Sequence, residues 1–95
     1  MLSTESAFIM RGPQAEFQAC QARVSELARA NKGENTESLT KAGSGTMRQR
    51  RVIQFRSVAQ RRGFEWAVRQ EQNEESGVRI RFLRHRASRP VPALV

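Results

Sequence analysis

The sequence predicts a small, mainly α-helical protein with a short C-terminal β element, an α+β chain. Three features predict it: apolar residues at helical spacing before residue 31, a helix start signal at Thr46, and alternation at residues 78–82. Two alternatives remain, a strand-helix-strand unit across residues 51–84 and a partly disordered chain. The second follows from a hydrophobic content of only 38% beside a net charge of +8. A protein partner would then complete the fold.

One amphipathic helix is expected at about residues 13–31. Pro13 suits a first helical turn, and apolar residues then recur at spacings of three and four, as one face of a helix requires. They are Phe17, Cys20, Val24 and Leu27. Residues 32–46 are rich in Gly, Ser, Thr and charge, which is typical of a linker. We therefore expect a neutral N-terminal segment, residues 1–46, followed by a basic helical and strand region, residues 47–95.

A second helix is expected from Thr46, because Gln49 three residues later completes a capping box. Gly63 weakens this helix by roughly 1 kcal/mol relative to Ala and is a point where it would split in two. Four residues would share the inner face of such a helix. They are Val52, Phe55, Ala59 and Trp66.

The segment at residues 78–82 alternates apolar residues with Arg79 and Arg81, the period of a strand with one dry and one wet face. A lone strand is unstable, so it needs residues 51–57 or a strand of another protein as its partner. The tail, residues 87–95, contains two prolines and is expected to be extended and flexible.

Charge is unevenly distributed along the chain. The first 46 residues carry five basic and five acidic side chains, whereas the rest carries twelve arginines against four glutamates. Arginine offers a planar fork of donors that matches phosphate oxygens, although a GC-rich genome also raises arginine content. The sequence therefore predicts a small basic nucleic-acid-binding protein, with RNA slightly favoured over DNA. The arginines expected to contact phosphates are Arg48, Arg50, Arg51, Arg56, Arg61, Arg62, Arg79, Arg81, Arg84 and Arg86.

Spacing supports this prediction. Arg79 and Arg81 on one strand face would lie roughly 6.6 to 7 Å apart, close to the separation of neighbouring phosphates. Phe64 and Trp66 stand beside arginines and would offer stacking surfaces for unpaired bases. Packing in the core is the commoner role for a large aromatic residue, and it is the one expected of Trp66.

Three other interpretations remain open. The chain could be a protein-binding regulator or assembly factor that docks the apolar stripe at residues 17–27 or the strand edge at residues 78–82. It could be a small ribonuclease using His85 as a general acid or base, although no partner Glu or Ser can be placed beside this histidine. It could also be a reading frame under little selection on its fold. Steep salt dependence would distinguish nucleic-acid binding from a packed apolar interface.

Several residue types are scarce or absent. The chain has no Asp or Tyr, and one His and one Cys, so neither a metal site nor a set of catalytic residues is expected, and no cofactor. Cys20 alone cannot form an intramolecular disulfide, which fits a reducing compartment. No signal peptide and no run of eighteen apolar residues is present, so a cytoplasmic protein without a membrane partner is expected.

Overall fold

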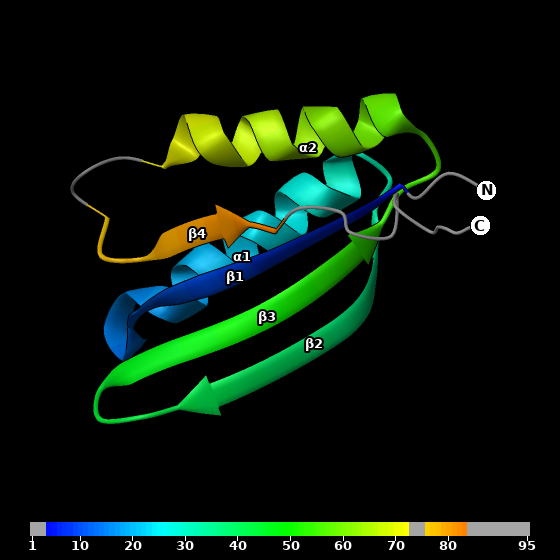
Figure 1. Cartoon of the computed structure of the whole chain (residues 1–95). Coiled ribbons are helices and arrows are strands. Elements are labelled where there is room, and N and C mark those ends of the chain that lie inside the picture. The colour runs from blue at the N-terminus through cyan, green and yellow to red at the C-terminus, as the bar shows by residue number, and fades with distance from the viewer. Residues whose placement is uncertain (1–3, 73–75, 84–95) are drawn as a thin grey trace.

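The computed structural model describes residues 4–72 and 76–83, which form a four-stranded antiparallel sheet with both helices on one face (Figure 1). The strands lie side by side in the order β2-β3-β1-β4. The elements in chain order are β1 (Glu5–Pro13), α1 (Gln14–Ala30), β2 (Glu34–Ala42), β3 (Thr46–Gln54), α2 (Val58–Glu71) and β4 (Arg79–Phe82). This βαββαβ order with a split sheet is the ferredoxin-like arrangement.

The expectation of a mainly α-helical chain with a short β element was wrong. A strand, β1, opens the described chain, and the segment expected to be a linker contains β2. The first part of the expected second helix is instead β3, so Thr46 and Gln49 lie in a strand and do not form a capping box. The strand-helix-strand order does occur in β3, α2 and β4, but β1 lies between the two strands. The partner of β4 is therefore β1, at the opposite end of the sequence.

Strand β1 is one of the two central strands of the sheet, and its residues alternate between the face covered by the helices and the open face. Ser6, Phe8 and Met10 are fully buried beneath the helices. The residues between them, Ala7 and Ile9, point to the other face, where no helix packs.

The two helices cover the buried face of the sheet. In α1 the buried residues are Phe17, Val24 and Ala28, at the spacing of one helix face. The start of α2 is fixed by Ser57, whose Oγ accepts a hydrogen bond from the Gln60 N–H at 3.1 Å. Neither described helix combines the length and apolar character needed to cross a membrane.

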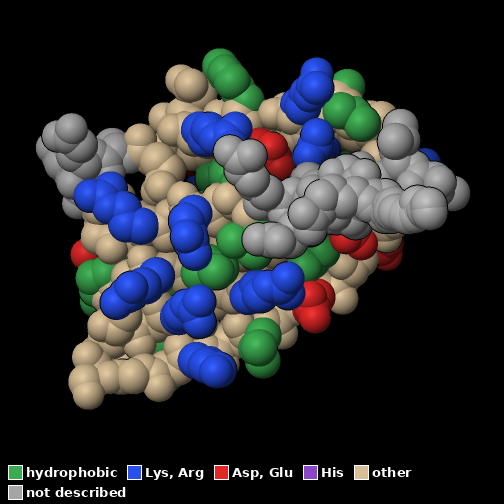
Figure 2. Space-filling model, viewed as in Figure 1, with side chains coloured by type: hydrophobic (Ala, Val, Ile, Leu, Met, Phe, Trp, Pro, Cys, Tyr) green, Lys and Arg blue, Asp and Glu red, His purple; other side chains and the backbone are tan. Residues whose placement is uncertain are grey.

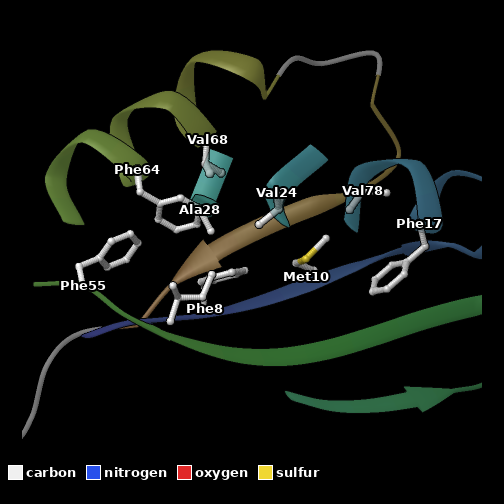
Figure 3. Packing of buried hydrophobic residues seen from close by; sticks show 10 residues of the cluster. Phe8, Met10, Phe17, Val24, Ala28, Phe55, Phe64, Val68 and Val78 are labelled. Carbon is white, nitrogen blue, oxygen red and sulfur yellow. The ribbon is translucent and has the colours of Figure 1, made fainter. Parts of the chain in front are cut away.

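A cluster of phenylalanines holds α2 against the sheet (Figure 3). The ring centroid of Phe64 lies 5.3 Å from that of Phe55 and 5.8 Å from that of Phe8, distances at which tilted aromatic pairs attract. Trp66, two residues further along the helix, is 64% exposed. The expectation that Trp66 packs in the core was therefore wrong, because it assumed a helix beginning at Thr46.

Two glycines permit close approaches between elements. A Cβ on Gly12 would lie 2.7 Å from the Val78 Cα, so β1 and the segment before β4 could not approach as they do. A Cβ on Gly63 would lie 2.8 Å from Oδ1 of Asn31, the residue at the end of α1. Gly63 thus does not split α2, which is continuous, but lets it pass close to the end of α1.

Candidate nucleic-acid interface

The face of the sheet opposite the helices carries most of the strands' basic side chains. Phe8 and Met10 of β1 pair with Arg51 and Gln49 of β3, and all four are buried on the helix side. Because strand residues alternate between faces, the residues between them point to the open face. The exposed basic residues of this face are Arg11, Lys41, Arg48, Arg50, Arg79 and Arg81. Figure 2 shows Lys and Arg side chains gathered over the strands on this side.

Four of these residues form a row across the whole sheet. Strand pairing places Lys41 opposite Arg48, and Arg48 opposite Arg11. Arg11 in turn lies opposite Arg79 on β4. Since neighbouring strands are about 4.8 Å apart, this cationic row spans roughly 14 Å. Lys41, Arg48, Arg11 and Arg79 together form this cationic row.

The open face changes character along the strands. The second row contains Arg50 and Arg81 with two apolar residues, Leu39 and Ile9. The third row contains Glu37, Val52 and Ala7. At the far end, Glu5 and Glu34 lie on either side of Gln54. Positive charge is therefore concentrated at the end of the sheet where the β2–β3 hairpin turns.

The cationic row has an electrostatic cost. Like charges directly opposite each other in an antiparallel sheet destabilise it, and Arg11 stands between two arginines. On the same face, Arg50 Nη1 forms an ion pair with Glu37 Oε1 at 2.9 Å. Both partners are exposed, so this pair contributes at most about 1 kcal/mol. An anion bound over the row would relieve the repulsion.

The arginines predicted from sequence are distributed over several sites. Four of them lie on the open face: Arg48, Arg50, Arg79 and Arg81. Arg61 and Arg62 lie on α2, on the other side of the sheet, and Arg56 lies in the loop before α2. Arg84 and Arg86, as well as His85 and the tail at residues 87–95, lie outside the described residues.

Arg51 lies on the helix side of the sheet and is 6% exposed. Its Nε donates a hydrogen bond to Asn35 Oδ1 at 3.1 Å, and its guanidinium lies 6.0 Å from the centroid of the Phe8 ring. Burial lowers the pKa of this arginine, and its Nη1 has no hydrogen-bond partner among the described residues. This side chain is therefore not placed to contact a ligand on the open face.

Two basic residues of the face, Arg11 and Lys41, were not predicted from the sequence. Both come from the half of the chain with no net charge, and the sheet brings them beside Arg48. The position of Arg11 could have been predicted from β1. Ser6, Phe8 and Met10 alternate as the buried residues of a strand do, and this alternation places Arg11 on the opposite face.

The open face carries basic side chains but no aromatic ring among the described residues. Within the described part of the chain, its apolar side chains are aliphatic, including Ile9, Leu39 and Val52. Phe64, expected as one stacking surface, is fully buried, and Trp66 is exposed on α2, away from this face. The arrangement can hold phosphates but does not offer a ring on which a base could stack. Among the described residues, no group of His, Cys, Asp or Glu could hold a metal ion.

Comparison of the sequence with protein-family models and with curated proteins gave no match. Solved structures are similar in fold. The ACT domain from the GTP pyrophosphokinase of Chlorobium tepidum superposes with a TM-score of 0.57 at 10% identity, covering 86% of this chain and 100% of that one. The de novo designed protein Foldit4 gives a TM-score of 0.61 at 14% identity, with 86% and 99% covered.

The C-terminal domain of the MgtC protein from Mycobacterium tuberculosis gives a TM-score of 0.51 at 10% identity, covering 90% of this chain and 95% of that one. At such low identity these likenesses show the fold alone. They agree with the ferredoxin-like strand order and with the correction of the mainly α-helical expectation.

Proposed function

We propose that this protein binds nucleic acid, with RNA ahead of DNA, through the open face of its sheet. The observation that supports the proposal is the cationic row, in which three strands each place an arginine beside the next and β2 adds Lys41. Like charges that lie directly opposite each other on neighbouring strands repel. A polyanion bound across the row would offset this repulsion, because each phosphate can accept hydrogen bonds from the guanidinium group of an arginine.

The expected mode is contact with phosphates, without reading of base sequence. Base recognition on an open sheet uses aromatic rings that stack on unpaired bases, and the described open face has aliphatic residues in their place. A single strand can follow a row of cations on a shallow sheet more closely than a stiff duplex can. Single-stranded RNA is for this reason the first ligand to test, and sequence preference is expected to be weak.

Fluorescence anisotropy with a labelled uridine oligonucleotide, measured over a series of salt concentrations, tests the proposal. If all six cations of the face meet phosphates, the logarithm of the association constant should fall with the logarithm of salt with a slope of about −4. The same measurement with single-stranded DNA and duplex DNA of matched sequence shows which of the three nucleic acids binds most tightly. Absence of binding in dilute salt, or binding that salt does not weaken, would contradict the proposal.

A protein-binding regulator is the second candidate, and the observation that favours it is an unpaired sheet edge. All nine residues of β2 are exposed, and β3 pairs with one side of β2 only. The apolar stripe of α1 is not available for this purpose, because Phe17 and Val24 are buried in the chain's own core. Binding through an edge strand would depend on backbone pairing and weakly on salt.

A further inference from the structure

We propose that two copies of this chain associate through the outer edge of β2, in an antiparallel pair of residues 37–41 centred on Leu39. Strand β2 is at the edge of the sheet, and it is exposed along its whole length on both faces. Such an edge presents unpaired N–H and C=O groups to any strand with a compatible sequence. The partner that fits here is a second copy of β2.

Backbone hydrogen bonds show which residues of β2 face outward. Gly43 donates its N–H to the Thr46 carbonyl at 2.8 Å, which makes these two residues a hydrogen-bonded pair of the β2–β3 hairpin. Hydrogen-bonded residues alternate along an antiparallel strand, so the backbone of Leu39 bonds to β3. The backbone groups of Ser38 and Thr40 therefore point to the outer edge. In the proposed pair, Ser38 of each copy bonds to Thr40 of the other.

The side chains of this segment complement a second copy of themselves. A two-fold axis at Leu39 places Glu37 of each copy opposite Lys41 of the other, which gives two ion pairs of opposite charge. The two Leu39 side chains meet at the axis in a non-hydrogen-bonded pair, where opposing Cα atoms are only about 4.5 Å apart. Leu39 is 59% exposed in the single chain, and with Trp66 it is one of the two large exposed hydrophobic residues of the described structure.

Other registers lose these contacts. Moving the axis by one residue sets Leu39 opposite Glu37 or Lys41 and removes the pairing of Glu37 with Lys41 between the two copies. Glu37 would then keep only its ion pair with Arg50 of its own chain. The regular segment is also bounded, by a bulge between Asn35 and Glu37 and by the hairpin turn at Gly43. The charges and the bulge thus disfavour pairing with unrelated strands while they permit pairing with a second copy of this segment.

The geometry of the pair has a consequence for the open face. A two-fold axis perpendicular to the sheet keeps the open faces of both copies on the same side and joins them into one continuous sheet. The two cationic rows would then face a single polyanion, and binding at the second row would become intramolecular. The association itself depends on the β2 edge and does not require that the chain bind nucleic acid.

Sedimentation measurements from about 1 µM to about 1 mM protein test the association across the range of weak dimers. The wild-type chain is expected to shift from monomer to dimer as concentration rises. Ser38→Pro removes an outward N–H and leaves the backbone bonds between β2 and β3 intact, so it should remain monomeric with an unchanged circular dichroism spectrum. A wild-type chain that is monomeric throughout this range would overturn the proposal.

Charge exchange tests the register and does not depend on proline. Glu37→Lys and Lys41→Glu should each weaken the dimer, because each sets like charges opposite each other across the axis. The double variant restores opposite charges and should recover dimerisation. If the double variant dimerises no better than the single variants, the proposed register is wrong.

Cross-linking provides a direct measure of the central pair. In a Cys20→Ser background, Leu39→Cys should form an intermolecular disulfide under mild oxidation, because the opposing Cα atoms fall within the range that a disulfide bridges. Glu37→Cys is the matched control, since its two copies would lie roughly 13 Å apart along the strands. Equal cross-linking of both variants would overturn the register.

The dimer and the proposed function can fail separately. Ser38→Pro retains all six cations of the open face, so a monomeric variant should still bind single-stranded RNA, with lower affinity than the dimer. Dimerisation without any RNA binding would refute the proposed function and support this inference.

Discussion

Neighbouring residues on β3 meet different environments because a strand alternates between two faces. Arg50 lies exposed on the open face, where it pairs with Glu37, whereas Arg51 is buried on the helix side beside Phe8. Buried arginines without a carboxylate partner lose hydration, which is why the pKa of Arg51 is lowered. The number of arginines in the sequence thus overstates the number that can meet a ligand.

Phe64 and Trp66 differ in the same way on α2, and substitution separates their roles. Phe64→Ala should lower the free energy of unfolding by about 3–5 kcal/mol, because it removes the ring that contacts Phe8 and Phe55. Trp66→Ala should change the free energy of unfolding by no more than about 0.5 kcal/mol. Urea denaturation measures both. Equal losses for the two variants would contradict the placement of α2.

The sequence predicted that Arg79 and Arg81 lie on the exposed face of a strand, as they do in the structure, because alternation with Ile80 and Phe82 is a local signal. Their contact with phosphates stays a prediction. Prediction from the sequence failed for Trp66, which was assigned to the inner face of a helix that actually begins at Val58. Arg11 and Lys41 were missed because charge was counted by segment. Their place beside Arg48 depends on strand pairing over long sequence separation.

At the level of elements, a helix or strand could be predicted from the sequence where one of its faces is buried and the other exposed. Helix α1 has one buried face, and its apolar spacing indicates it directly. Strand β1 is less visible, because Ala7 and Ile9 on the open face are also apolar and blur the alternation. Strand β2 is exposed on both faces, so no hydrophobic pattern marks it. Pairing with β3 makes this polar segment a strand.

An exposed ion pair joins the two helices, and its contribution to stability depends on pH. Arg23 Nε on α1 donates to Glu71 Oε1 on α2 at 2.8 Å, and these bonds lower the pKa of the glutamate. A carboxylate with a lowered pKa stabilises the fold above its unfolded pKa, and the contribution is lost as pH falls through the folded pKa.

Glu71→Gln should therefore be less stable than the wild-type chain at neutral pH, and the difference should shrink toward zero at about pH 2. Urea midpoints at both pH values measure it. Because the pair is largely exposed, the difference is expected to be small and to decrease with added salt. A difference that persists or grows in acid would contradict the role of this ion pair.

The cationic row should lower the stability of the sheet that carries it. Arg48→Gln removes the charge opposite both Arg11 and Lys41, so it should raise the free energy of unfolding in dilute buffer by up to about 1 kcal/mol. The gain should fade as salt rises, since the Debye length is about 10 Å at 0.1 M. Arg62→Gln on α2 is the control for a simple loss of charge. Equal gains for both variants would indicate a general effect of net charge.

At the scale of the whole molecule, the fold separates a packed side from a charged side. The helices and the buried face of the sheet contain the phenylalanine cluster, and the open face carries six basic residues graded toward the hairpin end. Both sequence halves contribute to this face, because β1 and β2 come from the neutral half and β3 and β4 from the basic half. The location of the charge is thus a property of the fold.

The most direct test of the account compares two double variants that lose the same charge from different places. Arg11→Gln with Arg48→Gln removes two cations of the open face, and Arg29→Gln with Arg62→Gln removes two exposed cations of the helices. Binding of a single-stranded RNA is measured for both over a salt series. The first variant should bind more weakly, with a salt slope smaller by about 1.4, while the second should bind nearly as the wild-type chain does. Equal losses in the two variants would show that net charge, and not the open face, accounts for the binding.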